Sequence, residues 1–239
     1  MAFGPERKTM TQAQVQGADI DVGLRKYMLG VYNYMSLGVA FTGVVALVVA
    51  MQPALMEAIF AGPLKWVLFG GVLLSGFIGP RIIMTKSPGA AHAVFWVYAA
   101  MWGALLAPMF YAYTGESIVR VFFITAAAFA GVSLYGYTTK KDLAPMGAFL
   151  MMATIGILLA IVVNLFLQSP VFQLLLSIVV VLVFAGLTAY ETQMIKNLYY
   201  EGDARDVQSR KSIFGAFLLY GSFVTMFIWL LQIFGVARE

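Results

Sequence analysis

Glu191 is the side chain in this sequence that is best placed to do chemistry in an apolar environment. It lies in the segment Tyr190-Glu191-Thr192-Gln193, which ends the apolar run 171–189. An ionisable group at membrane depth is costly and by default marks a functional site. A carboxylate there can take up a proton or make a transient contact with a cation. Glu191 is therefore the candidate pH-sensing residue and the one candidate metal contact.

The depth of Glu191 leaves two interpretations open. It lies about 20 residues into its predicted helix, roughly 30 Å from the start and near the inner membrane boundary. It either extends to water at that boundary, or it is buried enough for protonation to change how the helices meet. Thr192 follows it and Thr188 lies on the same helix face, so a hydroxyl partner is available.

Partners for Glu191 are expected on two other spans. Ser222 and Thr225 lie on the last span, where each hydroxyl either bonds its own helix backbone or contacts Glu191 across the helix pair. Arg81 ends the second span after a Gly-Pro pair. It is either a basic anchor at the membrane surface or a latch that pairs with Glu191 and holds the cytoplasmic mouth shut.

The remaining composition excludes several kinds of site. The chain has no cysteine and a single histidine, His92, which excludes thiolate sites and a zinc site built on several imidazoles. A calcium cage needs six to eight oxygen ligands, more than one intramembrane carboxylate supplies. A serine hydrolase would have to combine Ser75 or Ser222 with His92, and the spacing gives it little support. We expect no enzyme activity, no cofactor and no nucleic-acid partner.

The composition is typical of a membrane protein. Of the 239 residues, 62% are hydrophobic and only 11% are charged, against about a quarter charged in soluble domains. Each apolar segment is near the ~20 residues that a helix needs to cross the hydrocarbon. We predict an all-α, multi-pass protein with a polar tail at 1–28 and one seven-helix domain at 29–239. The predicted spans are 29–51, 64–84, 92–111, 117–137, 145–167, 171–195 and 213–234.

Basic residues gather on one side of these spans. Alternate connections and the N-terminal tail hold Arg7, Lys8, Arg25, Lys26, Arg81, Lys86, Lys140, Lys141, Lys196, Arg205, Arg210 and Lys211. The other side has Lys65, Arg120 and Arg238. The positive-inside rule then predicts a cytoplasmic N-terminus and a C-terminus outside, with the Glu191 end facing the cytoplasm.

Several local features predict how the helices pack. Small residues recur four apart, and such stripes let helix backbones approach closely within one molecule. They are Gly38-Thr42-Ala46-Ala50, Gly71-Ser75-Gly79 and Ala99-Gly103-Ala107. Pro108 should end or kink the third span because proline lacks a backbone donor. Asn164 is expected to hydrogen-bond between helices.

At these residues the sequence resembles the Bax inhibitor-1 family, which has bacterial members. The resemblance covers about 29–235, and its motifs are specific through their order and spacing. They are Gly103-Ala104-Leu105-Leu106-Ala107-Pro108, Lys140-Lys141-Asp142-Leu143, Asn164-Leu165-Phe166, Ala189-Tyr190-Glu191-Thr192-Gln193-Met194-Ile195, Glu201-Gly202-Asp203, Leu219-Tyr220, Phe223, Phe227-Ile228 and Leu230-Leu231.

The resemblance implies a fold of six helices around a central one and a site with two acids. In characterised relatives an acid pair near the ends of the last two helices responds to pH and gates a calcium leak, and an arginine latches the first acid. The first acid falls on Glu191, the second on Ser222, and the arginine near Arg81, with Lys86 as an alternative. Ser222 cannot ionise, so the mutual repulsion that raises one pKa of an acid pair is missing.

Two functions follow from this resemblance as expectations. The first is an inner-membrane, channel-like protein that gives a slow, pH-modulated leak of calcium or another cation near Glu191. The alternative is a non-conducting regulator of a membrane-bound, ATP-dependent protease or another membrane partner, as associated with bacterial members that lack the second acid. In both cases the chain is surrounded by the lipid bilayer.

Overall fold

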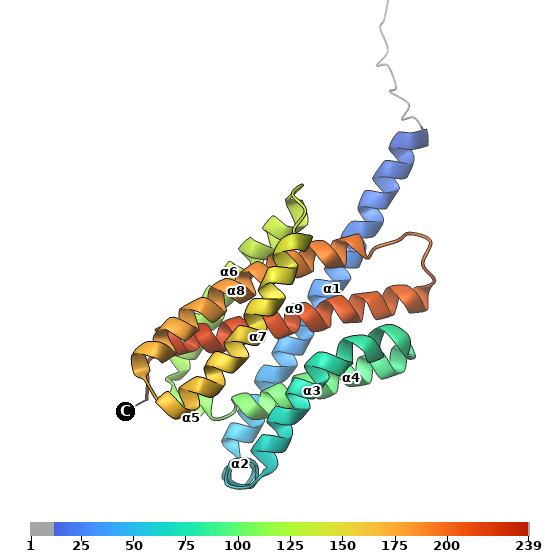
Figure 1. The fold of residues 1–239 in the computed structure, drawn as a ribbon. Helices are drawn as coiled ribbons and strands as arrows, with labels where there is room; N and C mark the ends of the chain where they lie inside the picture. Colours follow the sequence, from blue (N-terminus) through green and yellow to red (C-terminus); the bar gives the residue numbers. More distant parts are fainter. Residues whose placement is uncertain (1–11, 239) are drawn as a thin grey trace, which may run out of the picture.

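The computed structural model describes residues 12–238, and within that range the fold is almost entirely helical (Figure 1). The only strand-like feature there is one isolated antiparallel bridge between Tyr113 and Ala237. The helices are α1 (Gln12–Met51), α2 (Pro53–Phe60), α3 (Leu64–Thr85), α4 (Pro88–Leu106), α5 (Met109–Ala112), α6 (Gly115–Thr138), α7 (Ala144–Leu167), α8 (Pro170–Asn197) and α9 (Arg205–Phe234).

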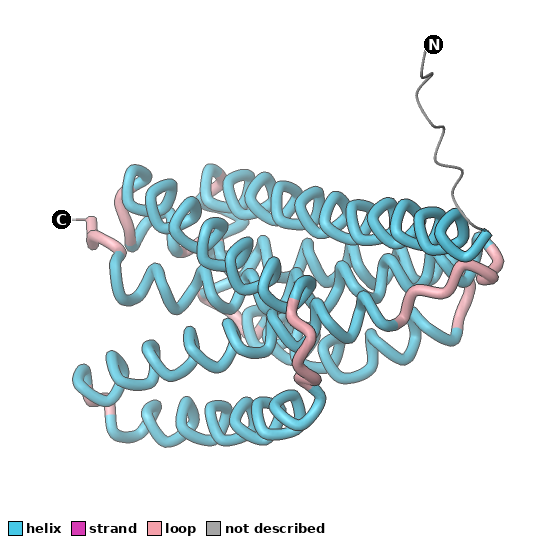
Figure 2. The backbone as a smooth tube through the Cα atoms, turned by 90° about the horizontal axis from the view of Figure 1, so that it is seen from above, coloured by secondary structure: helices cyan, strands magenta, loops and turns pink. Residues whose placement is uncertain are grey.

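Seven of the helical segments are long and apolar enough to cross a membrane, which confirms the predicted seven spans. Figure 2 shows them as long helices that lie roughly side by side. The N-terminal boundary differs from the prediction. Helix α1 begins at Gln12 and its apolar span at Val22, where a polar tail was expected up to residue 28. Tertiary packing accounts for this, because Gly23 and Tyr27 both lie against Tyr199 beyond α8.

Proline has opposite effects in two of the spans. At Pro108 the third span breaks, so α4 ends at Leu106 and the short α5 begins at Met109, as predicted. Pro80 instead lies inside α3, which continues through it. A membrane helix tolerates such a proline because neighbouring helices and side chains can satisfy the backbone group that loses its hydrogen bond.

The small-residue stripe on α1 lets α4 approach closely, as expected for packing within one molecule. A side chain at Gly103 would meet the Thr42 carbonyl oxygen at 2.8 Å and Val45 at 2.7 Å. The buried Thr42 hydroxyl bonds the Ala99 carbonyl oxygen of α4 at 3.1 Å and the Tyr220 hydroxyl of α9 at 2.6 Å. One residue therefore joins three helices.

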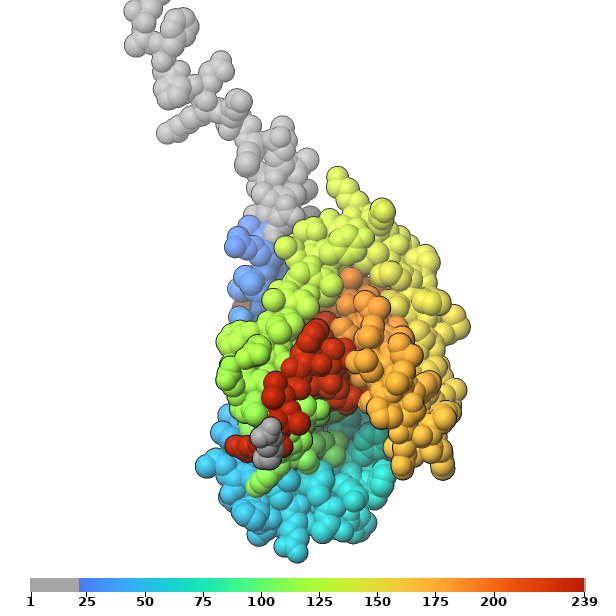
Figure 3. All heavy atoms as spheres, turned by 90° about the vertical axis from the view of Figure 1, so that its left-hand side faces the viewer, coloured from blue at the N-terminus to red at the C-terminus, as the bar shows by residue number. Residues whose placement is uncertain are grey.

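Helix α9 is the central helix of the bundle. Twelve of its residues are buried, including Tyr220 and Leu219 without exposed surface, and it packs against α1, α3, α4, α6 and α8. Figure 3 looks along the bundle and shows the red α9 surrounded by the other helices. A helix that is apolar all round is typical of such a buried position. Five of the six other spans pack on α9, whereas α7 packs on α8, so the six-around-one arrangement implied by the resemblance is formed only in part.

One end of the bundle, here called the basic end, holds the start of α1 and the connections α3–α4, α6–α7 and α8–α9. Two basic residues of α9 fix neighbouring backbone there. Arg210 donates to the carbonyl oxygens of Met84 and Lys86 at 2.8 and 3.3 Å, and so caps α3. Lys211 donates to the Leu198 carbonyl oxygen and pairs with Asp203. The cytoplasmic placement of this end remains a prediction from its charge.

Candidate functional site

A single turn of α8, Tyr190 to Gln193, contacts a different part of the molecule with each residue. Successive side chains of a helix point about 100° apart, so four consecutive residues face all round it. Such a turn can meet several neighbours only where the helix is surrounded. Helix α8 satisfies this condition at the basic end, where it packs against α6, α7 and α9.

Glu191 faces the central helix. Its Oε2 accepts a hydrogen bond of 2.7 Å from the Ser222 hydroxyl of α9, and Ser222 itself is buried. The Tyr98 hydroxyl of α4 lies beside Gly221, the residue that precedes Ser222 on α9. Glu191 is partly buried, so it neither lies fully in water nor is fully enclosed. The structure thus contains the contact that was predicted as one of two alternatives for Ser222.

Arg81 lies apart from this contact in the structure. Its side chain is exposed on α3, and no ion pair joins it to Glu191 among residues 22–238, whose side chains the structure describes. The ion pairs in that range are Glu116–Arg120, at 2.6 Å, and Asp203–Lys211. The latch assigned to Arg81 is therefore not formed in this conformation, and its role remains a prediction.

Thr192 connects α8 to α6 and, through it, to α1. The Thr192 side chain is fully buried, donates to the Thr188 carbonyl oxygen at 2.7 Å and lies 2.9 Å from the Ser133 hydroxyl oxygen. The Ser133 hydroxyl also bonds the Tyr32 phenol at 2.6 Å. These hydroxyls form a continuous hydrogen-bonded chain from α1 to the residue that follows Glu191.

Gln193 and Tyr190 hold the α6–α7 side of the turn. The Gln193 amide accepts from the Leu143 N–H and donates to the Lys141 carbonyl oxygen, both at 2.8 Å. The Tyr190 ring occupies the space in which a side chain at Gly147 of α7 would lie. The loop Lys140-Lys141-Asp142-Leu143 is thus fixed to α8 through its backbone.

The comparisons with known proteins agree with this architecture over nearly the whole chain. The profile of the family described as "Inhibitor of apoptosis-promoting Bax1" matches residues 24–239. The chain belongs to the Bax inhibitor family. It is 41% identical to an uncharacterized protein of Caulobacter vibrioides over 92% of each chain. It is also 40% identical to the inner membrane protein YbhL of Escherichia coli, over 90% of this chain and 94% of that protein.

Membership of the Bax inhibitor family makes the chain a multi-pass membrane protein, and its relative YbhL is named as an inner membrane protein. This chain likewise belongs to the inner membrane. The helix that carries the carboxylate is therefore one of the membrane-spanning helices, in which an uncompensated charge is expensive. The Ser222 hydroxyl is the compensation that the structure provides.

Other predicted residues of this Bax inhibitor family protein serve packing in the structure. The Asn164 amide donates to the Gln173 side chain, which confirms a bond between α7 and α8. Thr225 donates to its own helix at the Gly221 carbonyl oxygen. His92 bonds the Tyr34 phenol, and no hydrogen bond in the described range joins it to a serine.

Three residues of the site were missed by the sequence reasoning: Tyr32, Ser133 and Gln193. Gln193 was visible as part of the motif, but nothing in its spacing from Leu143 indicated a contact with that loop. Ser133 and Tyr32 lie in apolar spans like many other hydroxyl residues, so nothing in the sequence singled them out.

Residues 22–238 contain no group of three or more His, Cys, Asp or Glu side chains that could hold a metal ion. A cation contact at Glu191 is therefore a proposal for a passing ion, not for a stable site.

Proposed function

We propose that the protein permits a slow, pH-modulated leak of calcium or another cation, and that the Glu191–Ser222 contact stabilises its closed state. The observation that supports this most is the 2.7 Å bond from a buried hydroxyl to a carboxylate inside the bundle. It joins α8 to the central helix near the basic end of the bundle.

The chemistry of this bond makes it sensitive to protons. A hydrogen bond to an ionised carboxylate contributes about 1.5–3 kcal/mol, against about 0.5–1.5 kcal/mol for a neutral pair. Protonation of Glu191 thus removes about 1 kcal/mol from the α8–α9 contact, roughly a five-fold shift in an equilibrium between closed and open forms. The Tyr98 hydroxyl lies beside Gly221, next to this contact, and a phenol does not titrate near neutral pH. The leak is therefore expected to rise as the pH falls.

Flux into liposomes tests this proposal. Purified wild-type protein is reconstituted with a calcium-sensitive dye inside, and the rate of entry is compared at neutral and acidic pH. Glu191→Gln is expected to give the same rate at both values, because its side chain is neutral throughout. Glu201→Gln, which removes an exposed carboxylate from the α8–α9 connection, should keep the wild-type pH response. Wild-type flux no greater than that of empty liposomes would refute the proposal.

The alternative, a non-conducting regulator of a membrane-bound, ATP-dependent protease, is favoured by one observation. Ser222 occupies the position at which the resemblance expects a second acid, so the pair of carboxylates is absent from this chain. Without that pair, the contact can serve to fix one shape of the bundle for a partner. A stoichiometric complex with such a protease, isolated from membranes together with an absence of flux in pure lipid, would support this alternative over the leak.

A further inference from the structure

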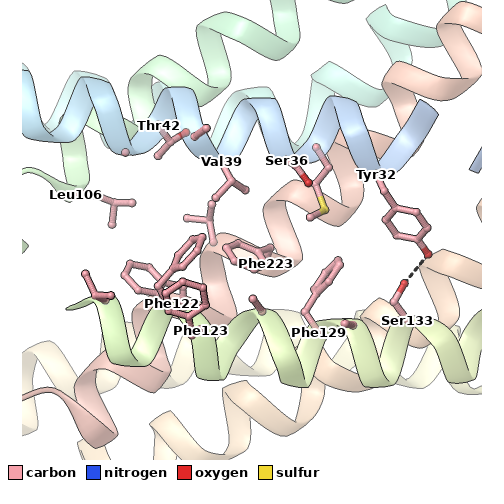
Figure 4. Close-up of a pocket in the computed structure, with 18 of the residues that line it drawn as sticks. Tyr32, Ser36, Val39, Thr42, Leu106, Phe122, Phe123, Phe129, Ser133 and Phe223 are labelled. Carbon is pink, nitrogen blue, oxygen red and sulfur yellow. Dashed lines mark hydrogen bonds between the residues drawn. The ribbon is translucent and has the colours of Figure 1, made fainter. Parts of the chain in front are cut away.

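A groove of about 1100 Å³ separates α1 from α6 (Figure 4). Both helices pack on the central α9, but along most of their length they do not pack on each other. Residues of α9, among them Phe223 and Phe227, form the floor. Several lining side chains, such as Leu29 and Phe123, are exposed, so the groove opens sideways toward the surrounding bilayer.

The two walls of the groove differ in shape. Helix α1 contributes the small residues Ser36, Ala40 and Gly43, which lie on one face and leave room. Helix α6 contributes aromatic rings, and Figure 4 shows Phe122, Phe123 and Phe129 directed toward the space between the helices. A smooth wall opposite a row of rings suits a flexible hydrocarbon chain better than a rigid polar molecule.

The two ends of the groove also differ. Arg25 and Tyr137 line its basic end, and the bond between Tyr32 and Ser133 crosses the space nearby, as Figure 4 shows. Lys196 lies just behind, where it donates to the Tyr137 carbonyl oxygen and sits over the Tyr137 ring. None of the described residues that line the groove is acidic. The mouth is therefore cationic, and the rest of the groove is apolar.

We propose that this groove binds one phospholipid with an anionic headgroup, taken from the leaflet at the basic end. The headgroup phosphate lies at Arg25, and one acyl chain follows α1 between the small residues and the rings. The segment from Tyr32 to Ala46 covers about 20 Å of helix. That length accommodates a chain that normally spans about half of the ~30 Å hydrocarbon core. Ser133 also bonds Thr192, so the lipid would lie against the hydroxyl chain that ends beside Glu191.

The absence of cysteine in the sequence allows this proposal to be tested with a unique thiol label. Ala126→Cys places a fluorescent bimane in the groove, and Ala127→Cys places it on the exposed face of the same turn outside the groove. Each protein is reconstituted in phosphatidylcholine with a small, varied fraction of lipid that carries bromine on its acyl chains. Bromine quenches the fluorescence of the label at short range. The brominated lipid is phosphatidylglycerol in one series and phosphatidylcholine in the other.

The expected result is selective quenching inside the groove. At Ala126→Cys, half-maximal quenching should need roughly five-fold less brominated phosphatidylglycerol than brominated phosphatidylcholine, the factor expected for one cation near an anionic headgroup. At Ala127→Cys the two lipids should quench alike. Arg25→Gln should abolish the preference at Ala126→Cys, whereas Lys26→Gln, which removes the neighbouring charge outside the groove, should retain it.

Two quenching results would overturn the assignment. Equal quenching by both lipids at Ala126→Cys would mean that hydrocarbon enters the groove without recognition of a headgroup. Quenching at Ala127→Cys with none at Ala126→Cys would mean that protein, such as a helix of a second copy, covers the groove. Because a bulky label in the groove could itself displace the lipid, the unlabelled protein provides a second measurement. Native mass spectrometry should show one phosphatidylglycerol retained by the wild type and by Lys26→Gln but lost from Arg25→Gln, and equal retention in all three would refute the proposal.

Discussion

The strength of the Glu191–Ser222 bond can be measured by a double-mutant cycle. Ser222→Ala removes the donor, and Glu191→Gln keeps the shape of the acceptor but not its charge. The cycle therefore reports the difference between a charged and a neutral hydrogen bond, about 1 kcal/mol. This is above the ~0.6 kcal/mol average for hydrogen bonds between membrane helices and below the largest values near 1.7 kcal/mol.

The sign of the pH dependence follows from the same reasoning. The coupling is present while Glu191 is ionised and is lost as the pH falls and the carboxyl group is protonated, because the acid then resembles glutamine. Free energies of unfolding would be measured for the four proteins in mixed micelles, by titration with sodium dodecyl sulfate and circular dichroism, at neutral and acidic pH. The control cycle pairs Glu191→Gln with Thr225→Ala, whose hydroxyl bonds its own helix, and should show no coupling.

A particular outcome would refute this account of the site. If the Glu191–Ser222 coupling were below about 0.3 kcal/mol at neutral pH, the bond would contribute no more than the usual error of additivity. A coupling of normal size that did not change with pH would show that the carboxyl group keeps one protonation state throughout. In either case the contact would join α8 to α9 without responding to protons.

Two further predictions concern the neighbours of the same turn. Gly136→Ala should destabilise the protein by about 1–3 kcal/mol, because the added methyl group would collide with the Ala189 backbone of α8. Gly131→Ala, on the same helix with open space around it, is the control in the same unfolding assay. Gln193→Ala should speed trypsin cleavage in the basic loop between α6 and α7 several-fold, because it removes two backbone bonds of that loop. The control variant Gln208→Ala should be cleaved by trypsin at the wild-type rate. Equal cleavage rates for the two variants would contradict the assigned role of Gln193.

The spans could be predicted from sequence because a single physical requirement determines them. A membrane helix must satisfy its backbone internally and present about 20 apolar residues to the lipid, and both properties are local. Pro108 is local in the same sense, since a missing N–H interrupts its own helix. The start of α1 was misplaced because its polar N-terminal part is held by packing against Tyr199, far along the chain.

The candidate site could be predicted only in part. The cost of a carboxylate in an apolar run identified Glu191 without any knowledge of its neighbours. Its partner could not be identified in this way, because a helix rotates about 100° per residue and Arg81 or Ser222 could each have faced it. The role of Gln193 depends on the path of a loop some fifty positions away. No periodic pattern in the sequence indicates a contact between two such distant segments.

The arrangement of the four residues limits where protons can act. The Thr192–Ser133 bond and the two bonds of the Gln193 amide involve groups that do not titrate near neutral pH, and Tyr190 contacts Gly147 through its ring. These contacts join α8 to α6 and α7 at every physiological pH. Of the four residues, only Glu191 carries a carboxyl group, and it faces α9. A change driven by protons therefore belongs at the interface between α8 and the central helix, with α6, α7 and α8 remaining together as one unit.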